Sequence, residues 1–276
     1  MIPKSGYRFS DKIMRKGHNM RKSYVVPGID KRLLIKDAAK LMPDPMRRTF
    51  LRSAASLGAL AFLTGCDIID GDAAEGVLRK ISEFNDGAQA AIFSRAKLAP
   101  VYPESAITRP FPFNAYYDED EAPTVDGATY KLEVSGLVDN KKSWTLDELH
   151  ALPEVSQITR HVCVEGWSAI GSWQGAQLSE FLKRIGADTK AKYVWFKCAE
   201  GYTNTIDMPT AMHPQTQMSF KFDNKLLPRA YGFPMKIRMP TKLGYKNPKY
   251  VVAMEVTNTD HGGYWENQGY NWFGGS

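Results

Sequence analysis

The sequence predicts an α+β fold with a largely mixed or antiparallel sheet. Predicted strands outnumber predicted helices and occur in runs rather than in alternation with helices, which is typical of segregated α+β folds. No G-x-G-x-x-G or Walker loop is present, so a dinucleotide- or ATP-binding domain is not indicated. The chain has 276 residues, 43% hydrophobic and 12% aromatic. That composition excludes a disordered, collagen-like or disulfide-dense protein and suits one large domain or two small ones.

Three helices are predicted from apolar spacing and capping residues. Residues 74–96 carry apolar side chains close to a 3.6-residue period, which indicates an amphipathic helix. These side chains are Val77, Ile81, Phe84, Ala88, Ala91 and Ile92. Thr145 and Glu148 have the spacing of a capping box and predict the start of a short helix. Residues 178–186 predict a third helix, which ends at its glycine.

The strands are predicted from alternating or short buried apolar runs. In chain order they are residues 130–136, 156–164, 193–199, 235–240 and 249–256. The second strand is expected to lead into a loop that contains Trp167 and Trp173. Asp223 and Asn224 predict a turn between two further short strands. Residues 97–128, rich in Pro, Asp and Glu, predict an extended ordered loop.

The net charge of +6 is unevenly distributed along the chain. Residues 1–65 hold 14 Lys and Arg against 4 Asp and Glu, whereas residues 66–276 hold 22 against 26. A protein that binds the phosphate backbone of a nucleic acid needs positive charge on its folded domain. The mildly acidic body therefore argues against a nucleic-acid partner.

The N-terminal segment has the layout of an export signal. Arg47 and Arg48 precede a weakly apolar run of thirteen residues, Ser53 to Gly65, which is shorter than the roughly twenty residues that span a bilayer. The run RRTFLR resembles the twin-arginine (Tat) signal of bacteria, and Leu63–Cys66 resembles the lipobox of lipoproteins. These resemblances imply export by the Tat machinery, a lipid on Cys66 and a place at the inner membrane in the periplasm. The alternative is an ordinary amphipathic helix with an incidental arginine pair and a core cysteine.

Three cysteines constrain the chemistry: Cys66, Cys163 and Cys198. A disulfide between Cys163 and Cys198 remains open, because an oxidising compartment would permit it. There is no CxxC pair and no histidine pair at ligand spacing, so a zinc site is not indicated. The nucleophile-elbow motif of serine hydrolases is also missing.

Four segments resemble the sulfite oxidase superfamily. The run HVCVEGWSAIGSWQG resembles its molybdenum-ligand segment, in which one cysteine thiolate at the position of Cys163 binds the metal. The run AMHPQT, residues 226–251 and the run GYWENQGY resemble later motifs, and the likeness extends from about Phe113 to Tyr270. A soft thiolate suits such a metal. The resemblance implies a sulfite oxidase-type molybdopterin-binding domain over residues 97–276, preceded by an export signal with an extended basic leader (1–65) and a lipidated tether with the amphipathic helix (66–96).

The resemblance also implies a set of cofactor-binding residues. They are Asn114, Tyr117, Asp118, Cys198, Tyr231, Lys236, Asn247, Pro248 and Lys249. Lys249, with the backbone of the two residues before it, matches the turn that binds the pterin phosphate. Three positions depart from the family: Lys236 stands where an arginine is usual, Tyr231 where relatives have Asn or His, and Cys198 where the periplasmic methionine-sulfoxide reductases have threonine.

Three residues near Cys163 are candidates for catalysis. Glu165 could relay a proton or orient metal-bound water, or it could be a solvated loop carboxylate. Arg160 and His161 could present positive charge to an oxyanionic substrate, and strand alternation implies that one of the pair faces away.

The function that these observations favour is two-electron oxygen-atom transfer by an exported molybdopterin-dependent oxidoreductase. Reduction of S-oxides and oxidation of sulfite are the two reactions in view. No CxxCH haem motif is present, and the resemblance implies a membrane b-type cytochrome as electron partner. The alternative is a metal-free envelope lipoprotein that uses the same fold as a binding module and contains the 163–198 disulfide.

Overall fold

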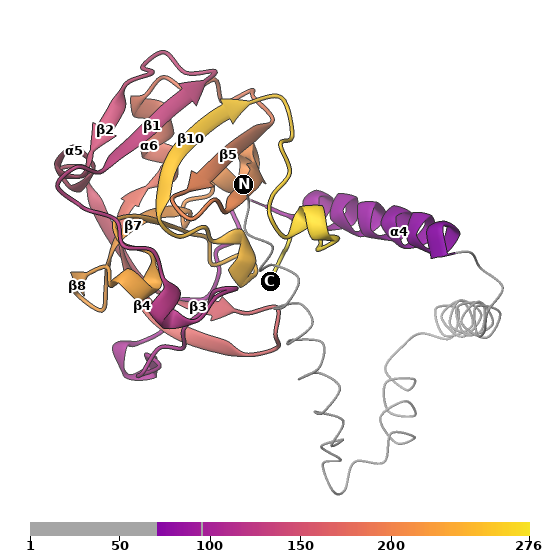
Figure 1. The fold of residues 1–276 in the computed structure, drawn as a ribbon, viewed down its shortest axis with the longest axis horizontal. Coiled ribbons are helices and arrows are strands. Elements are labelled where there is room, and N and C mark those ends of the chain that lie inside the picture. The colour runs from indigo at the N-terminus through magenta and orange to yellow at the C-terminus, as the bar shows by residue number, and fades with distance from the viewer. Residues whose placement is uncertain (1–70, 95) are drawn as a thin grey trace, which may run out of the picture. The chain divides into compact units, whose positions relative to one another are not determined.

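The computed structural model describes residues 71–94 and 96–276 (Figure 1). The chain divides into two compact units, Met1–Val77 and Leu78–Ser276, and the strands of the described residues all lie in the second. Helix α4 spans Gly71–Ile92 and confirms the predicted amphipathic helix. The predicted Tat signal and lipobox lie outside the described residues. Within the described part of the chain, no helix is long and apolar enough to cross a bilayer.

Two five-stranded sheets form the body of the protein (Figure 1). The first has the order β2-β1-β10-β5-β6 and contains β1 (Lys131–Gly136), β2 (Ser143–Thr145), β5 (Tyr193–Cys198), β6 (Thr203–Asp207) and β10 (Val251–Thr257). The second contains β3 (Glu154–Val162), β4 (Ser168–Gln177), β7 (Gln217–Phe222), β8 (Lys225–Leu226) and β9 (Lys236–Arg238). Strands β1 and β10 pair in parallel, and the other pairs are antiparallel. The α+β fold with a mixed or antiparallel sheet is therefore confirmed.

The helices of the body are short and begin at residues that cap them. They are α5 (Leu146–His150), α6 (Leu178–Arg184) and α7 (Met208–Ala211). At the start of α5 the Thr145 hydroxyl accepts from the Glu148 amide, and the Glu148 carboxylate accepts from the Thr145 amide, so the capping box is confirmed. After α6 the chain turns at Gly186 with a φ of +65°, a left-handed conformation that glycine adopts without strain.

Some sequence predictions need correction. Trp173 lies inside β4 and is fully buried, not in a loop, because the loop after β3 is short. The glycines of β4 look like loop residues in the sequence, but they let other parts of the chain approach closely: a Cβ on Gly171 would lie 2.9 Å from the Phe111 ring. Strands β2, β4 and β6 and helix α7 were not predicted. The turn at Asp223 and Asn224 joins β7 to β8, as predicted.

The main hydrophobic core lies between the two sheets and joins them. From the first sheet it includes Leu132, Phe196 and Met254, and from the second it includes Met218 and Phe220. A smaller cluster of Phe111, Ala169, Trp173, Phe222 and Leu227 packs beside β4 and β7. Together these clusters hold fixed the strand ends from which the site is built.

Replacing Gly175 by alanine is expected to destabilise the protein strongly. Its Cβ would lie 1.9 Å from the Met218 carbonyl oxygen, at the irregularity where β4 pairs with β7. Backbone cannot move aside cheaply, so we expect a loss of about 3 kcal/mol or more in the free energy of unfolding. Gly87→Ala is the matched control, because nothing lies within 4 Å of its Cβ and helix α4 should tolerate or gain from it. Denaturant unfolding of both variants tests this, and similar stabilities would contradict it.

Candidate functional site

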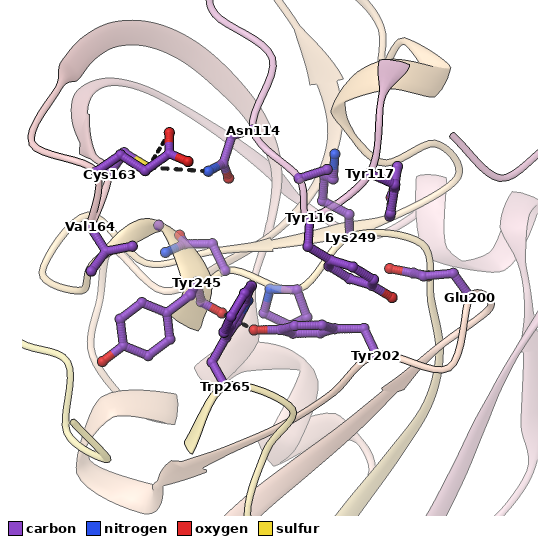
Figure 2. A pocket seen from close by; sticks show the side chains of 15 residues that line it. Asn114, Tyr116, Tyr117, Cys163, Val164, Glu200, Tyr202, Tyr245, Lys249 and Trp265 are labelled. Atoms are coloured by element: carbon purple, nitrogen blue, oxygen red, sulfur yellow. Dashed lines mark hydrogen bonds between the residues drawn. The ribbon is translucent and has the colours of Figure 1, made fainter. Parts of the chain in front are cut away.

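A cavity opens where β3, the β5–β6 turn and the segments around residues 114–117 and 244–249 meet (Figure 2). It encloses about 600 Å³, part of it open to solvent. Its lining side chains include Asn114, Tyr116, Tyr117, Cys163, Glu165, Glu200, Tyr202, Tyr245, Asn247, Pro248, Lys249 and Trp265. Segments distant in sequence thus surround one thiol with aromatic rings, carboxylates and a lysine.

The Cys163 thiol lies on this wall because β3 ends in a tight turn. The Cys163 amide donates to the Trp167 carbonyl at 2.9 Å, and Gly166 adopts a φ of +92° within the turn. Asn114 Nδ2 lies 3.5 Å from the Cys163 sulfur and donates to it, and the sulfur lies 3.9 Å from Glu165 Oε2 (Figure 2). The turn therefore holds the sulfur between an amide donor and a carboxylate.

Burial raises the pKa of the Cys163 thiol, and the nearby Glu165 carboxylate adds to the rise, while Asn114 opposes it. The free chain therefore holds a neutral thiol at neutral pH. A cation bound there would reverse this balance, because coordination deprotonates a thiol. Within the described residues, no group of three or more His, Cys, Asp or Glu side chains is placed to hold a metal ion.

Three cationic side chains are buried next to the cavity. Lys236 and Arg238 come from β9 and Lys249 from the segment before β10. No described carboxylate forms an ion pair with any of them. Burial lowers all three pKa values, that of Arg238 to about 9 and that of Lys249 to about 8, and Lys249 and Arg238 further lower that of Lys236. Arg238 donates to Asn247 Oδ1 and the Arg160 carbonyl, and Lys249 donates to the Ala230 carbonyl, but no described carboxylate balances the three charges. Because buried charges without a counter-charge are costly, this cluster favours an anionic ligand.

Several buried polar atoms at the same place have no hydrogen-bond partner in the described residues. They are both ring nitrogens of His161, Arg238 Nε and Glu200 Oε2, whereas the buried Tyr117 and Tyr250 hydroxyls interact with each other. Buried polar groups normally have hydrogen-bond partners, so a cluster of buried polar atoms without partners indicates a missing ligand. With the cation cluster and the single thiol, they fit a ligand that has an anionic end, hydrogen-bonding edges and a metal that accepts a thiolate.

The structure brings together Asn114, Tyr117, Cys163, Glu165 and the Asn247–Lys249 segment, as the sequence predicted. The Asn247 side chain already hydrogen-bonds within the protein: its Oδ1 accepts from Arg238 and the Met239 amide, and its Nδ2 donates to the Leu243 carbonyl. Lys249 Nζ donates to the Ala230 carbonyl at 2.9 Å and lies over the Phe113 ring.

Four predicted cofactor contacts lie off the cavity wall: the buried Lys236, Asp118, Tyr231 and Cys198. Asp118 precedes the 3₁₀ helix Glu119–Glu121 and is exposed. The Tyr231 hydroxyl donates to the Phe111 carbonyl at 2.7 Å. Cys198 is buried, and it and Cys163 are both free, so the disulfide of the alternative function is wrong.

Arg160 and His161 point in different directions, as strand alternation requires. Arg160 is exposed and lies over the Tyr102 ring, on the wall of a separate cavity. His161 is 1% exposed, and burial together with Lys236, Arg238 and Lys249 keeps its pKa well below the usual value. Arg160 therefore faces away from Cys163, as the alternation implied, and the burial of His161 opposes a positive charge on its ring.

Glu200 is the main residue of the site that sequence reasoning missed. It lies in the β5–β6 turn, and no periodic pattern marks it. Figure 2 shows its carboxylate on the side of the cavity opposite Cys163, near Tyr116 and Tyr117. Burial raises its pKa to about 7, although Lys249 lowers it.

This shift predicts a pH effect on the ligand-free chain. The unfolded Glu200 carboxyl loses its proton near its ordinary pKa of 4.5, but the folded one keeps it until about 7. Stability should therefore fall as pH rises between these values, by up to about 3 kcal/mol. In Glu200→Gln that part of the pH dependence should disappear. Urea unfolding of both chains from pH 4.5 to 7.5 measures it, and parallel curves would contradict the assignment.

Comparison with known proteins identifies the family of the chain. The model of the oxidoreductase molybdopterin binding domain matches residues 119–265. A protein of Azospira oryzae with the provisional name protein-methionine-sulfoxide reductase subunit YedZ1 is 60% identical, over 87% of this chain and 92% of its own length. The uncharacterized oxidoreductase YuiH of Bacillus subtilis is 26% identical over 62% of this chain and 86% of its length. The protein-methionine-sulfoxide reductase catalytic subunit MsrP of Ralstonia nicotianae is 28% identical over 59% of this chain and 58% of its length.

A pterin that carries a phosphate and a metal has the chemistry of the missing ligand. That ligand was inferred from the unpartnered polar atoms, the buried cations and the single thiol. The family match spans more than half of the chain and contains Cys163, Glu200 and Lys249. The chain belongs to the family of the oxidoreductase molybdopterin binding domain, in the sulfite oxidase superfamily, and is a molybdopterin-dependent oxidoreductase.

Proposed function

We propose that this protein is an exported reductase of S-oxides, with methionine sulfoxide as the substrate class, and that Cys163 ligates its molybdenum. The observation that carries the proposal is the buried Cys163 thiol on the wall of a cavity flanked by three unpaired buried cations. The substrate class is supported by the relatives whose printed names are protein-methionine-sulfoxide reductases. The balanced reaction consumes two electrons and two protons per sulfoxide and releases a thioether and water.

The chain's own residues would hold the cofactor through its polar edges. Lys236, Arg238 and Lys249 would neutralise the phosphate, since charge-assisted bonds to phosphate are strong. Glu200 offers an unpartnered carboxyl oxygen to the pterin, and Tyr117 offers a hydroxyl that otherwise interacts with that of Tyr250. When bound, the cofactor supplies two-electron oxygen-atom transfer at its molybdenum.

Glu165 is the residue we assign to proton delivery. Its Oε2 accepts from Trp167 Nε1 at 3.0 Å, which holds the carboxylate 3.9 Å from the Cys163 sulfur. The side chain is exposed, so it can exchange protons with solvent. A carboxyl fixed next to the reacting centre and in contact with water meets the geometric demand on a general acid.

We also propose where the protein is located and which protein supplies its electrons. Export by the Tat machinery, a lipid on Cys66 and a periplasmic place at the inner membrane rest on the sequence of residues 46–67. A membrane b-type cytochrome is proposed as the source of electrons. Arg47→Lys with Arg48→Lys should retain the protein in the cytoplasm, which cell fractionation measures.

The function is tested with purified holoenzyme and a reduced redox dye. Oxidation of the reduced dye is expected with methionine sulfoxide, free or within a denatured protein. Sulfite is not expected to reduce the oxidised dye. Molybdenum should be present at about one atom per chain. Sulfite oxidation without sulfoxide reduction would reverse the proposed direction, and a protein purified without molybdenum from a host that makes the cofactor would refute it.

A further inference from the structure

Helix α4 attaches to the body through its polar face. The Asp86 carboxylate accepts from the amides of Trp272 and Phe273, at 3.3 and 2.8 Å, and Gln89 Oε1 accepts from the Gly275 amide at 3.1 Å. One turn later, the Phe93 ring packs edge-on against Phe273. Residues spaced in this way share one face of a helix. That face is therefore already occupied by the C-terminal segment.

The apolar stripe of the helix is on another face and is uncovered. Ile81, Phe84 and Ile92 are 51%, 76% and 79% exposed. At 100° per residue, this stripe lies about 130° around the helix from the attached face. The usual arrangement, in which the apolar face of an amphipathic helix packs on the core, is reversed here.

The exposed apolar surface continues beyond the helix. Leu98 and Val101 are 57% and 68% exposed, so five of the ten large apolar side chains that the described residues leave exposed lie between Ile81 and Val101. A second cavity, of about 1250 Å³ including open solvent, is lined by Ile92, Leu98, Lys97 and Arg160 among others. A concentrated apolar surface next to a cavity marks an interaction site.

The charges around the stripe favour a lipid surface as its partner. Lys80 flanks the stripe on the helix, and Lys97 and Arg160 lie at the cavity, whereas the exposed Glu83 is on nearly the opposite side of the helix. An apolar stripe edged by basic side chains is the pattern of helices that lie in the membrane interface, where the cations meet lipid phosphates.

The short segment between Cys66 and the helix also favours a lipid surface as the partner of the stripe. Gly71, the first residue of α4, follows Cys66 by five positions, so an anchor on Cys66 keeps the helix start within about 18 Å of the bilayer. We propose that the stripe of Ile81, Phe84 and Ile92, together with the exposed Leu98 beyond the helix, lies in the interface of a bilayer that contains anionic phospholipid. This inference rests on the proposed place of the protein at the membrane, and it would orient the body relative to the lipid surface.

The test uses the full-length holoenzyme with Cys66→Ser, so that no acyl chain contributes. Flotation with vesicles of phosphatidylethanolamine and phosphatidylglycerol measures binding. Ile81→Gln, Phe84→Gln and Ile92→Gln together should lower the partition coefficient by about 100-fold. The matched control, Val155→Gln with Leu226→Gln, also removes exposed apolar side chains and should change it less than about twofold. Lys80→Gln with Lys97→Gln should weaken binding to these vesicles but not to phosphatidylcholine vesicles.

Three outcomes would overturn the inference. The stripe variant could bind vesicles as well as the parent chain. It could convert a dimer of the parent into a monomer in sedimentation without lipid, which would make a second copy the partner. It could instead lose electron transfer from the cytochrome in detergent solution, which would make that protein the partner. Molybdenum content and dye-linked sulfoxide reduction are measured on the same samples, so a failure of the proposed function is distinguished from a failure of lipid binding.

Discussion

A chain carrying Cys163→Ser is expected to be purified without molybdenum and to reduce sulfoxide at least about 1,000-fold more slowly than the parent. The hydroxyl that replaces the thiol is a harder and far less acidic donor, so it does not substitute for a thiolate at such a metal. Because burial raises the pKa of the free thiol, the metal must supply the driving force for its deprotonation. Metal analysis and dye-linked kinetics measure the two effects.

Cys198→Ala is the matched control for this experiment. Cys198 is the other buried free cysteine, and it does not line the cavity that contains Cys163. We expect its replacement to leave molybdenum at the parent level. Equal molybdenum in the Cys163 variant and the parent would remove Cys163 from its proposed role, whatever the activity of the variant.

Lys236→Met is expected to have opposite effects on the ligand-free and the loaded protein. The Lys236 side chain is 3% exposed, and no described carboxylate pairs with it. Its charge therefore destabilises the folded chain unless an anion is bound. Methionine has a similar shape without the charge. We expect the ligand-free chain to gain about 1 to 3 kcal/mol in its free energy of unfolding and cofactor affinity to fall about 100-fold.

The pH dependence gives this prediction a second readout. Burial, with Lys249 and Arg238, lowers the pKa of Lys236 well below its ordinary 10.5. The unfolded lysine then holds a proton that the folded one has released, so the ligand-free parent should become more stable as pH rises toward 10.5. The variant should lack this rise.

Thermal unfolding of ligand-free protein and pterin analysis of loaded protein provide the measurements. Lys197→Met, at an exposed position of β5, is the control and should change neither quantity appreciably. If the ligand-free Lys236 variant is less stable than the parent, or if the variant keeps full cofactor affinity, Lys236 does not serve to bind an anion.

The elements that were predicted correctly are those whose signal is local. The capping box at Thr145, the glycine after α6 and the turn at Asp223 each depend on a few neighbouring residues, so the sequence shows them directly. Strand β4 was missed because its glycines serve contacts with other strands, which no local pattern records. The apolar period of α4 predicted the helix, but it could not show that a polar face attaches to the body.

The sequence by itself determined the family and cofactor class of this protein, because the motifs around Cys163 and residues 226–251 are specific when they occur together. Only the tertiary structure decided which side chains meet. It placed Glu200 opposite Cys163, turned Arg160 away, left His161 neutral and kept both cysteines of the body free. The physical reason is that pKa values, burial and charge balance depend on residues brought together from distant strands, and a linear order of residues does not contain those distances.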